Sequence, residues 1–173
     1  MGLNSDCKPE QLNQFALLGS LYAQHILKVS NPKVGLLNVG EEEGKGNLLS
    51  QATFPLLKEN SQINFIGNME GRDIFTEKCD VIVCDGFTGN IILKMAESVY
   101  DLAALRNFDQ DIYFNRFHYE NYGGSPVLGV AKPVIIGHGI SSTKAFTNMI
   151  SLAVQMVASD ICTKMAESFK AIN

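Results

Sequence analysis

The stretch KVGLLNVG, residues 33–40, is an apolar run that ends in an asparagine, a valine and a glycine. Three other runs share this character: INFIGNM (63–69), CDVIVCDGF (79–87) and PVIIGHG (133–139). Each is short and unbroken, which is typical of a strand buried on both faces. Strands of this kind belong to parallel sheets covered by helices, so the four runs predict an α/β fold.

Helical patterns separate the runs. Residues 9–28 carry apolar side chains at helical spacing, with Pro9 near the first turn. Residues 88–105 predict a second helix, and residues 141–172 predict a long third one. The alternation of strands and helices predicts a single α/β domain, residues 1–173, with a mainly parallel sheet.

Three local features refine this expectation. Thr88 and Asn90 are candidate caps for the second helix. Residues 47–59 look helical, but Pro55 predicts a kink or two short pieces. Residues 106–131 are aromatic and polar, with a Gly123-Gly124 turn ahead of a strand expected at 127–130. This region is interpreted as an excursion from the core, either an antiparallel arm or an interface element.

Composition narrows the function classes. The chain has 173 residues, 46% hydrophobic and 18% charged, which favours one ordered domain. A net charge of −4 argues against nucleic-acid binding, which starts from clustered positive charge. Neither a signal peptide nor an apolar run long enough to span a membrane is apparent, so we expect a soluble cytoplasmic protein. The four cysteines have no metal-ligand spacing, so we expect reduced thiols and no metal.

Glycine and polar residues follow all four predicted strands. In an open α/β sheet, ligands bind at the carboxyl ends of the strands. Glycines there let backbone N–H groups approach a ligand, and the following helix N-termini favour an anion. The pattern therefore predicts an anion site at this edge of the sheet.

Lys45 lies between two glycines in the segment EEEGKGN, residues 41–47. It is either an ordinary exposed loop lysine or a point charge for phosphate or a developing oxyanion. Glu41, Glu42 and Glu43 are most simply a solvated turn, although one carboxylate could orient Lys45. The segment does not match the Walker A pattern.

Four more side chains have two readings each. Asn90 either caps a helix or hydrogen-bonds a phosphoryl or acyl oxygen. Asp85 either orders a loop or acts as a general acid or base. His138, between two glycines, is a candidate site residue. Arg72, in EGRD (70–73), could bind an anion, but a surface ion pair between the arginine and the aspartate is the simpler interpretation. No nucleophile motif is present, so a nucleophilic hydrolase is not supported.

The motifs VGLLNVGEEEGKGN, INFIGNMEGRD, DVIVCDGFTGN, YGGSPVLGV and VIIGHGISSTKAF resemble, in order and spacing, the bacterial PlsX phosphate acyltransferases. The resemblance covers nearly the whole chain. It implies an enzyme that converts long-chain acyl-acyl carrier protein and inorganic phosphate to acyl phosphate, without a cofactor, at the entry to phospholipid synthesis. The implied fold is a three-layer α/β/α sandwich like that of isocitrate and isopropylmalate dehydrogenases. The implied partners are acyl carrier protein, a second copy of the chain, and a downstream glycerol-phosphate acyltransferase.

Carried over motif by motif, the resemblance makes Lys45 and Asn90 the leading catalytic residues, with Asp85 and His138 beside them. The residues expected to bind phosphate or substrate are Asn38, Gly40, Gly44, Gly46, Asn47, Asn68, Arg72, Gly86, Thr88, Gly89, Gly139 and Ser141. Our hypothesis is that Lys45 binds phosphate or transition-state charge while Asn90 positions the acyl oxygen.

The sequence departs from the family in two places. Family members are longer at the N-terminus, so the chain resembles their C-terminal portion. The stretch from Lys94 to Tyr122 is shorter than expected, and in the family it includes an amphipathic hairpin implicated in peripheral membrane contact. Either the arm is shortened here or residues are missing around Leu105–Arg106. Two other functions therefore stay open: a short-chain phosphotransacylase that uses coenzyme A, and a non-catalytic dimerisation or carrier-binding fragment. A dinucleotide-dependent dehydrogenase is disfavoured, because no GxGxxG follows a predicted strand.

Overall fold

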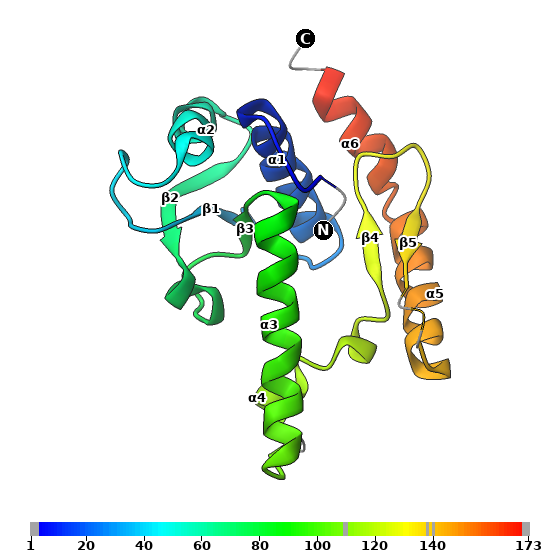
Figure 1. Ribbon diagram of the computed structural model, residues 1–173. Helices are drawn as coiled ribbons and strands as arrows, with labels where there is room; N and C mark the ends of the chain where they lie inside the picture. The colour runs from blue at the N-terminus through cyan, green and yellow to red at the C-terminus, as the bar shows by residue number, and fades with distance from the viewer. Residues whose placement is uncertain (1–3, 109–110, 138, 140, 171–173) are drawn as a thin grey trace. The chain divides into compact units, whose positions relative to one another are not determined.

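A computed structural model of the protein describes residues 4–108, 111–137, 139 and 141–170 (Figure 1). The chain divides into two compact units, Gly2–Phe87 and Thr88–Asn173. We refer to them as the N-terminal unit and the C-terminal unit and describe each by itself.

The N-terminal unit contains a three-stranded parallel sheet. Its strands are β1 (Lys33–Asn38), β2 (Asn64–Glu70) and β3 (Val81–Val83), in the order β2-β1-β3. Three of the four apolar runs therefore form parallel strands as predicted, and the α/β class with a parallel sheet is confirmed. Because the strands are parallel, their carboxyl ends lie at one edge of the sheet.

Two helices cover this sheet, α1 (Pro9–His25) and α2 (Leu48–Glu59) (Figure 1). α1 begins at Pro9 as predicted, and the Gln11 side chain accepts the Lys8 backbone N–H at 2.8 Å. The helices contribute apolar side chains to one core with the strands, and burial of this surface is the main force that holds the unit together. The buried members are Leu12, Ala16, Val34, Leu36, Phe54, Leu57 and Val83.

The two short pieces that Pro55 offered as one outcome do not form, because α2 is one continuous helix. Pro55 is exposed and removes one intrahelical hydrogen bond. On either side of it, Phe54 and Leu57 are buried in the core, and the Phe54 ring packs edge-on against Phe65 with centroids 5.3 Å apart. Packing of the buried face thus outweighs the local cost of the proline.

An irregularity in β2 turns a polar residue inward. The pairing register between β1 and β2 shifts between Val34 and Leu36, opposite Gly67, which has φ +100°. After this shift Asn68 and Met69 are both buried. The Met69 side chain fills the space where a side chain on Gly35 would stand. Asn68 is thereby placed beneath the loop that follows β1.

The C-terminal unit contains most of α3 (Gly86–Leu105), followed by α4 (Ile112–Asn115), the 3-10 turn η2 (Tyr119–Asn121), a hairpin, α5 (Thr143–Ala158) and α6 (Ile161–Lys170). The hairpin pairs β4 (Ser125–Val127) antiparallel with β5 (Val134–Ile136). The segment that leads into the hairpin packs closely on α5, because a side chain on Gly123 would lie only 2.6 Å from the Met149 backbone nitrogen. The N-terminal unit has the other 3-10 turn, η1 (Gly71–Phe75).

Three expectations about this part of the chain were wrong. The fourth apolar run forms β5, whose Val134 and Ile136 are 46% and 47% exposed, because it pairs with β4 in a hairpin rather than with the parallel strands. β4 also lies earlier than the strand expected at 127–130. The long third helix is broken at Ser159 and Asp160, where Asp160 has φ +52°, a conformation that a helix does not contain.

The start of α3 also differs from the expectation. The helix begins at Gly86, so Thr88 and Asn90 lie within its first turns and do not cap it. Among the described residues no single helix has the length and apolarity to cross a membrane; α5 and α6 reach that threshold only as a pair bent by 51°.

Candidate active site

The loop between β1 and α2 is closed by side chains at both ends. At the end of β1, the Asn38 side-chain amide donates from Nδ2 to the Lys45 backbone oxygen at 3.0 Å. Its side-chain oxygen Oδ1 accepts the Val39 N–H at 2.8 Å. Within the loop, the Lys45 N–H donates to the Glu42 backbone oxygen at 3.1 Å. Lys45 is thus presented from a backbone that hydrogen bonds constrain on both sides.

The N-terminus of α2 completes the loop. Asn47 is the N-cap, and its side-chain oxygen accepts the Ser50 N–H at 2.9 Å. The Gln51 amide donates to the backbone oxygens of Gly44 and Gly46, at 3.1 and 3.0 Å. Asn38 and Asn47, both predicted to bind ligand, therefore hydrogen-bond the protein backbone here, Asn38 within the loop and Asn47 at the first turn of α2.

Gly46 is the glycine that this geometry requires. Its φ is +96°, and a side chain there would overlap the Asn38 side-chain oxygen and lie 2.9 Å from the Ser50 Cβ. A side chain on Gly40 would lie 3.1 Å from the Lys45 Cγ, so Gly40 makes room for the lysine stem. A side chain on Gly44, in contrast, would meet nothing within 4 Å.

The Lys45 ammonium is exposed, and within the described residues no hydrogen bond or ion pair engages it. It precedes the N-cap of a 12-residue helix, whose first N–H groups carry partial positive charge. A cation beside such a helix end is suited to bind an anion. Lys45 and the N-terminus of α2 therefore lie together at the carboxyl edge of the sheet.

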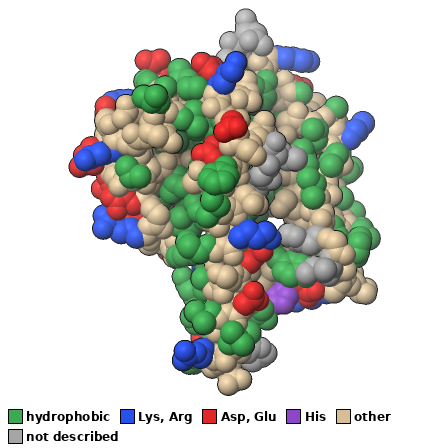
Figure 2. All heavy atoms as spheres, in the orientation of Figure 1, with side chains coloured by type: hydrophobic (Ala, Val, Ile, Leu, Met, Phe, Trp, Pro, Cys, Tyr) green, Lys and Arg blue, Asp and Glu red, His purple; other side chains and the backbone are tan. Residues whose placement is uncertain are grey.

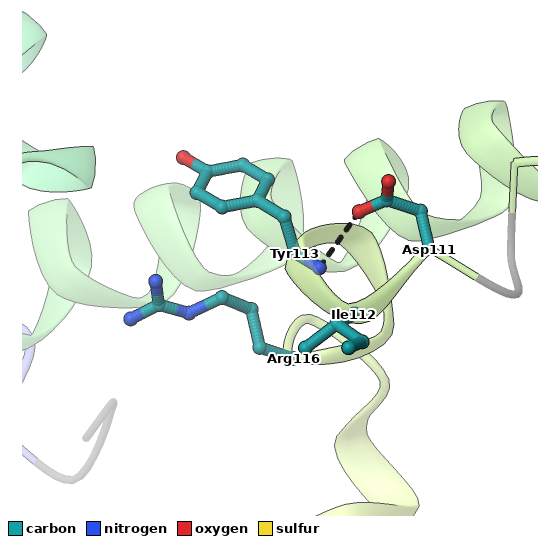
Figure 3. A pocket seen from close by; sticks show the side chains of 4 residues that line it. All are labelled: Asp111, Ile112, Tyr113 and Arg116. Atoms are coloured by element: carbon teal, nitrogen blue, oxygen red, sulfur yellow. Dashed lines mark hydrogen bonds between the residues drawn. The ribbon is translucent and has the colours of Figure 1, made fainter.

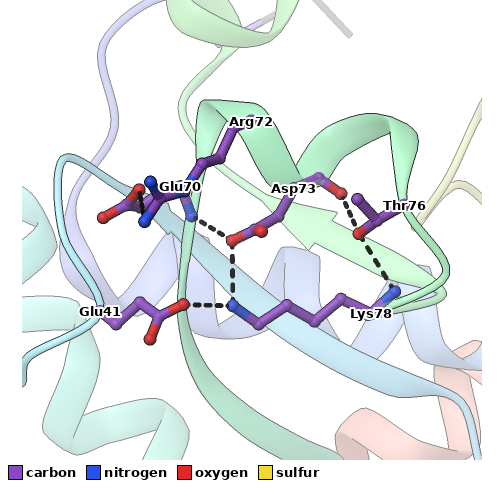
Figure 4. Close-up of polar contacts among 6 residues, drawn as sticks. All are labelled: Glu41, Glu70, Arg72, Asp73, Thr76 and Lys78. Carbon is purple, nitrogen blue, oxygen red and sulfur yellow. Dashed lines mark hydrogen bonds and ion pairs between the residues drawn. The ribbon is translucent and has the colours of Figure 1, made fainter.

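The three glutamates before Lys45 have separate anchors, which sequence reasoning did not find. Glu41 pairs with Lys78 at 2.6 Å, and Glu43 pairs with Lys58 at 2.6 Å (Figure 4 for Glu41). The backbone oxygen of Glu42 accepts the Asn68 amide at 2.8 Å. The acidic triplet therefore ties the loop to neighbouring elements rather than facing water alone.

The end of β2 contributes Asn68 and Arg72. Asn68 is 4% exposed, and its side-chain oxygen is buried without a hydrogen-bond partner among the described residues. Arg72, in η1, pairs with Glu70 at 2.7 Å, while 75% of its side chain stays exposed (Figure 4). Arg72 thus makes a surface ion pair, as the simpler interpretation held, but its partner is Glu70 and not the expected aspartate.

The end of β3 is joined to the start of the chain. The Gly86 N–H donates to the Asn4 backbone oxygen at 2.8 Å, and a side chain on Gly86 would lie 2.5 Å from that oxygen. The Cys7 thiol donates to the same oxygen at 3.3 Å. Gly86 thus serves close backbone packing at the first turn of α3, beside Asp85.

Both thiols near this point resist ionisation. Burial raises the pKa of Cys7, and burial raises the pKa of Cys84 to about 11, with the Asp85 charge adding to both shifts. A thiolate nucleophile is therefore disfavoured here. This agrees with the interpretation of these residues as reduced structural cysteines.

The remaining predicted residues belong to the C-terminal unit. Thr88 and Gly89 are partly buried in the first turns of α3, and Asn90 is exposed there. Gly139 and Ser141 lie between β5 and α5. His138 lies outside the described residues. Of the predicted set, the sheet edge of the N-terminal unit brings together the 38–47 loop, Asn68, Arg72, Asp85 and Gly86.

Two further observations concern binding sites. No group of three or more His, Cys, Asp or Glu side chains in the described part of the chain is placed to hold a metal ion.

An open depression on α4 is lined by Asp111, Ile112, Tyr113 and Arg116, with the Arg116 guanidinium 5.5 Å from the Tyr113 ring centre (Figure 3). It contains none of the predicted site residues.

Comparison with known proteins gives consistent matches. The family model described as "Fatty acid synthesis protein" matches residues 1–107 and 102–164. The chain is 44% identical over 191 residues to the phosphate acyltransferase of Aquifex aeolicus, covering 99% of the chain and 56% of that protein. It is 49% identical over 157 residues to the phosphate acyltransferase of Syntrophomonas wolfei, covering 88% of the chain and 49% of that protein.

The chain spans about half the length of the curated relatives it matches. The alignment with the Aquifex protein is longer than the 173 residues of the chain, so that relative has residues this chain lacks. The two segments matched by the family model meet at residues 102–107, near the position where the sequence predicts missing residues. With the model covering most of its length, the chain belongs to the fatty acid synthesis protein family, the PlsX family that its motifs indicated.

Proposed function

We propose that the protein transfers a long-chain acyl group from acyl carrier protein to inorganic phosphate, forming acyl phosphate for phospholipid synthesis. The observation that carries this proposal is Lys45, an unengaged cation on a constrained loop at the N-terminus of α2. The names of the curated relatives support the same reaction class. No cofactor is needed, because phosphate is itself the nucleophile.

The reaction requires the enzyme to stabilise negative charge at two places, on the phosphate nucleophile and on the carbonyl oxygen. A phosphate oxygen attacks the thioester carbonyl carbon, negative charge builds on the carbonyl oxygen, and the C–S bond then breaks to release the carrier thiol, which takes up a proton. Lys45 and the first N–H groups of α2 hold the phosphate, and Asn90 positions the acyl oxygen. Asp85 and His138 are the proposed acid–base residues.

We further propose a cytoplasmic enzyme with the three-layer sandwich of the isocitrate dehydrogenase type. It would act as a homodimer, take acyl carrier protein as its substrate partner and supply a glycerol-phosphate acyltransferase. α5 supports the dimer, since it exposes Phe146, Ile150, Val154 and Val157 at helical spacing. Ile112 and Phe108 in the arm, both exposed, support a peripheral membrane contact.

Acyl phosphate formation tests the proposal. We expect the purified chain to consume C16 acyl-acyl carrier protein only when phosphate is present, and Lys45→Ala to lower kcat/KM about 100-fold or more, as loss of a transition-state charge partner does. Near-normal turnover by Lys45→Ala would contradict the assignment. Activity with short-chain acyl coenzyme A instead would identify a phosphotransacylase. Carrier binding without turnover by the wild-type chain would favour a non-catalytic module, which its half-length match keeps open.

A further inference from the structure

The loop that presents Lys45 is tethered at three consecutive residues by three different segments. Lys78, between η1 and β3, pairs with the Glu41 carboxylate, and Lys58 of α2 pairs with the Glu43 carboxylate. Between them, Asn68 of β2 holds the Glu42 backbone oxygen at 2.8 Å. The hydrogen bond from the Lys45 N–H to that same oxygen passes the constraint on to Lys45.

Of the two lysines that pair with the loop, Lys78 has more ion-pair contacts than Lys58. Its ammonium lies 2.6 Å from Glu41 Oε1 and 3.0 Å from Asp73 Oδ2 (Figure 4). Asp73 in turn accepts the Glu70 backbone N–H at 3.1 Å, and the Lys78 backbone N–H donates to Thr76 Oγ1 at 3.3 Å. The Lys78 side chain is 37% exposed, compared with 59% for Lys58. It is therefore held in place before it reaches the loop.

The electrostatics agree with this geometry. The hydrogen bond from Lys78 holds the pKa of the Asp73 carboxyl below its ordinary value, and the hydrogen bonds to Glu41 and Asp73 raise the pKa of Lys78. Because the pKa of Asp73 is lowered on folding, its contribution is present above its unfolded value of 3.8 and is lost only as pH falls through the folded value. The anchor is charged throughout the neutral range.

The loop needs such tethers because its composition is permissive. Three of the seven residues from Gly40 to Gly46 are glycines, and a side chain added at Gly44 would meet no atom within 4 Å. Glycines of this kind leave the backbone many conformations. Without an external anchor, the Lys45 ammonium would sample many positions relative to the α2 N-terminus, and phosphate binding would have to restrict them.

We infer that Lys78 is a positioning residue for the active site: through its ion pair with Glu41 it restricts the 41–46 loop and holds Lys45 where phosphate binds. This inference rests on the proposed function for the identity of the anion. The mobility of the loop can be measured whatever anion the site binds.

The test uses Glu41→Gln, which removes the charge but retains the size and every lysine of the chain. Lys45 is a trypsin site, so the rate of cleavage after Lys45, followed by mass spectrometry under native conditions, reports loop opening. We expect cleavage about two- to fivefold faster than in the wild type, with phosphate binding weakened by a similar factor, the range expected for one exposed ion pair. Glu97→Gln, which breaks the exposed Lys94–Glu97 pair (2.7 Å) on α3, is the matched control and should change neither quantity.

A second pair of variants separates positioning from folding. Lys78→Arg retains the charge and should keep both wild-type values, whereas Lys78→Met should reproduce Glu41→Gln in a protein that circular dichroism shows to be folded. Unchanged cleavage and unchanged phosphate affinity in Glu41→Gln would overturn the inference while leaving the proposed function intact. Faster cleavage in a protein whose wild type binds no phosphate would retain the loop tether and overturn the proposed function instead.

Discussion

Gly46 is the residue whose identity depends most directly on the geometry of the loop. We expect Gly46→Ala to lower the free energy of unfolding by about 1–3 kcal/mol, because an alanine would adopt a disfavoured φ and overlap the Asn38 side chain. Gly44→Ala is the matched control, since its added methyl group meets nothing and its φ is not positive. Urea denaturation of both variants measures the difference. Equal losses in the two would show that the Gly46 geometry is not as described.

Sequence reasoning at this scale found the loop but not its anchors. The glycines around Lys45 and the strand before it are local signals, and they predicted a lysine at a turn near a helix N-terminus. Lys58 and Lys78 pair with glutamates 15 and 37 residues away, and no local pattern marks such contacts. The roles of Asn38 and Asn47 were also out of reach, because an asparagine that closes a loop and one that binds a ligand have the same sequence context.

At the scale of elements, the exposed face of α5 is the main unexplained surface. If it forms the proposed homodimer interface, Ile150→Glu should convert the dimer to monomer in sedimentation velocity, because it places a charge in the centre of an apolar contact. Ser151→Glu, on the neighbouring polar face of the same helix, should leave the dimer unchanged. A wild-type chain that sediments as a monomer, or an Ile150→Glu dimer, would contradict the interface.

The errors in predicting elements share a physical cause. Helical periodicity continues through residues 141–172, so it cannot reveal that Asp160 adopts a positive φ between α5 and α6. At Pro55 the sequence suggested two helical pieces where the structure has one helix. The local free-energy cost of the proline is smaller than the gain from burying Phe54 and Leu57. Existence and type of α1, β1, β2 and β3 were predicted well, because buried runs and amphipathic helices are the strongest signals a sequence contains.

At the scale of the whole molecule, the parallel sheet followed from the sequence, while the pairing of the fourth apolar run did not. Short apolar runs look the same whether they join a parallel sheet or a hairpin, and β5 joined a hairpin with β4. Because the chain spans about half the length of these relatives, assays of the 173-residue chain itself measure what it does.

Phosphate binding tests the central claim most directly. In a ³¹P NMR titration of the 173-residue chain, we expect saturable phosphate binding in the wild type, at least about tenfold weaker binding in Lys45→Met, and partial retention in Lys45→Arg, since a hydrogen bond to a charged group is lost in the first and kept in the second. Circular dichroism of the same samples establishes that each variant is folded. Equal phosphate affinity in the wild type and Lys45→Met would contradict the account.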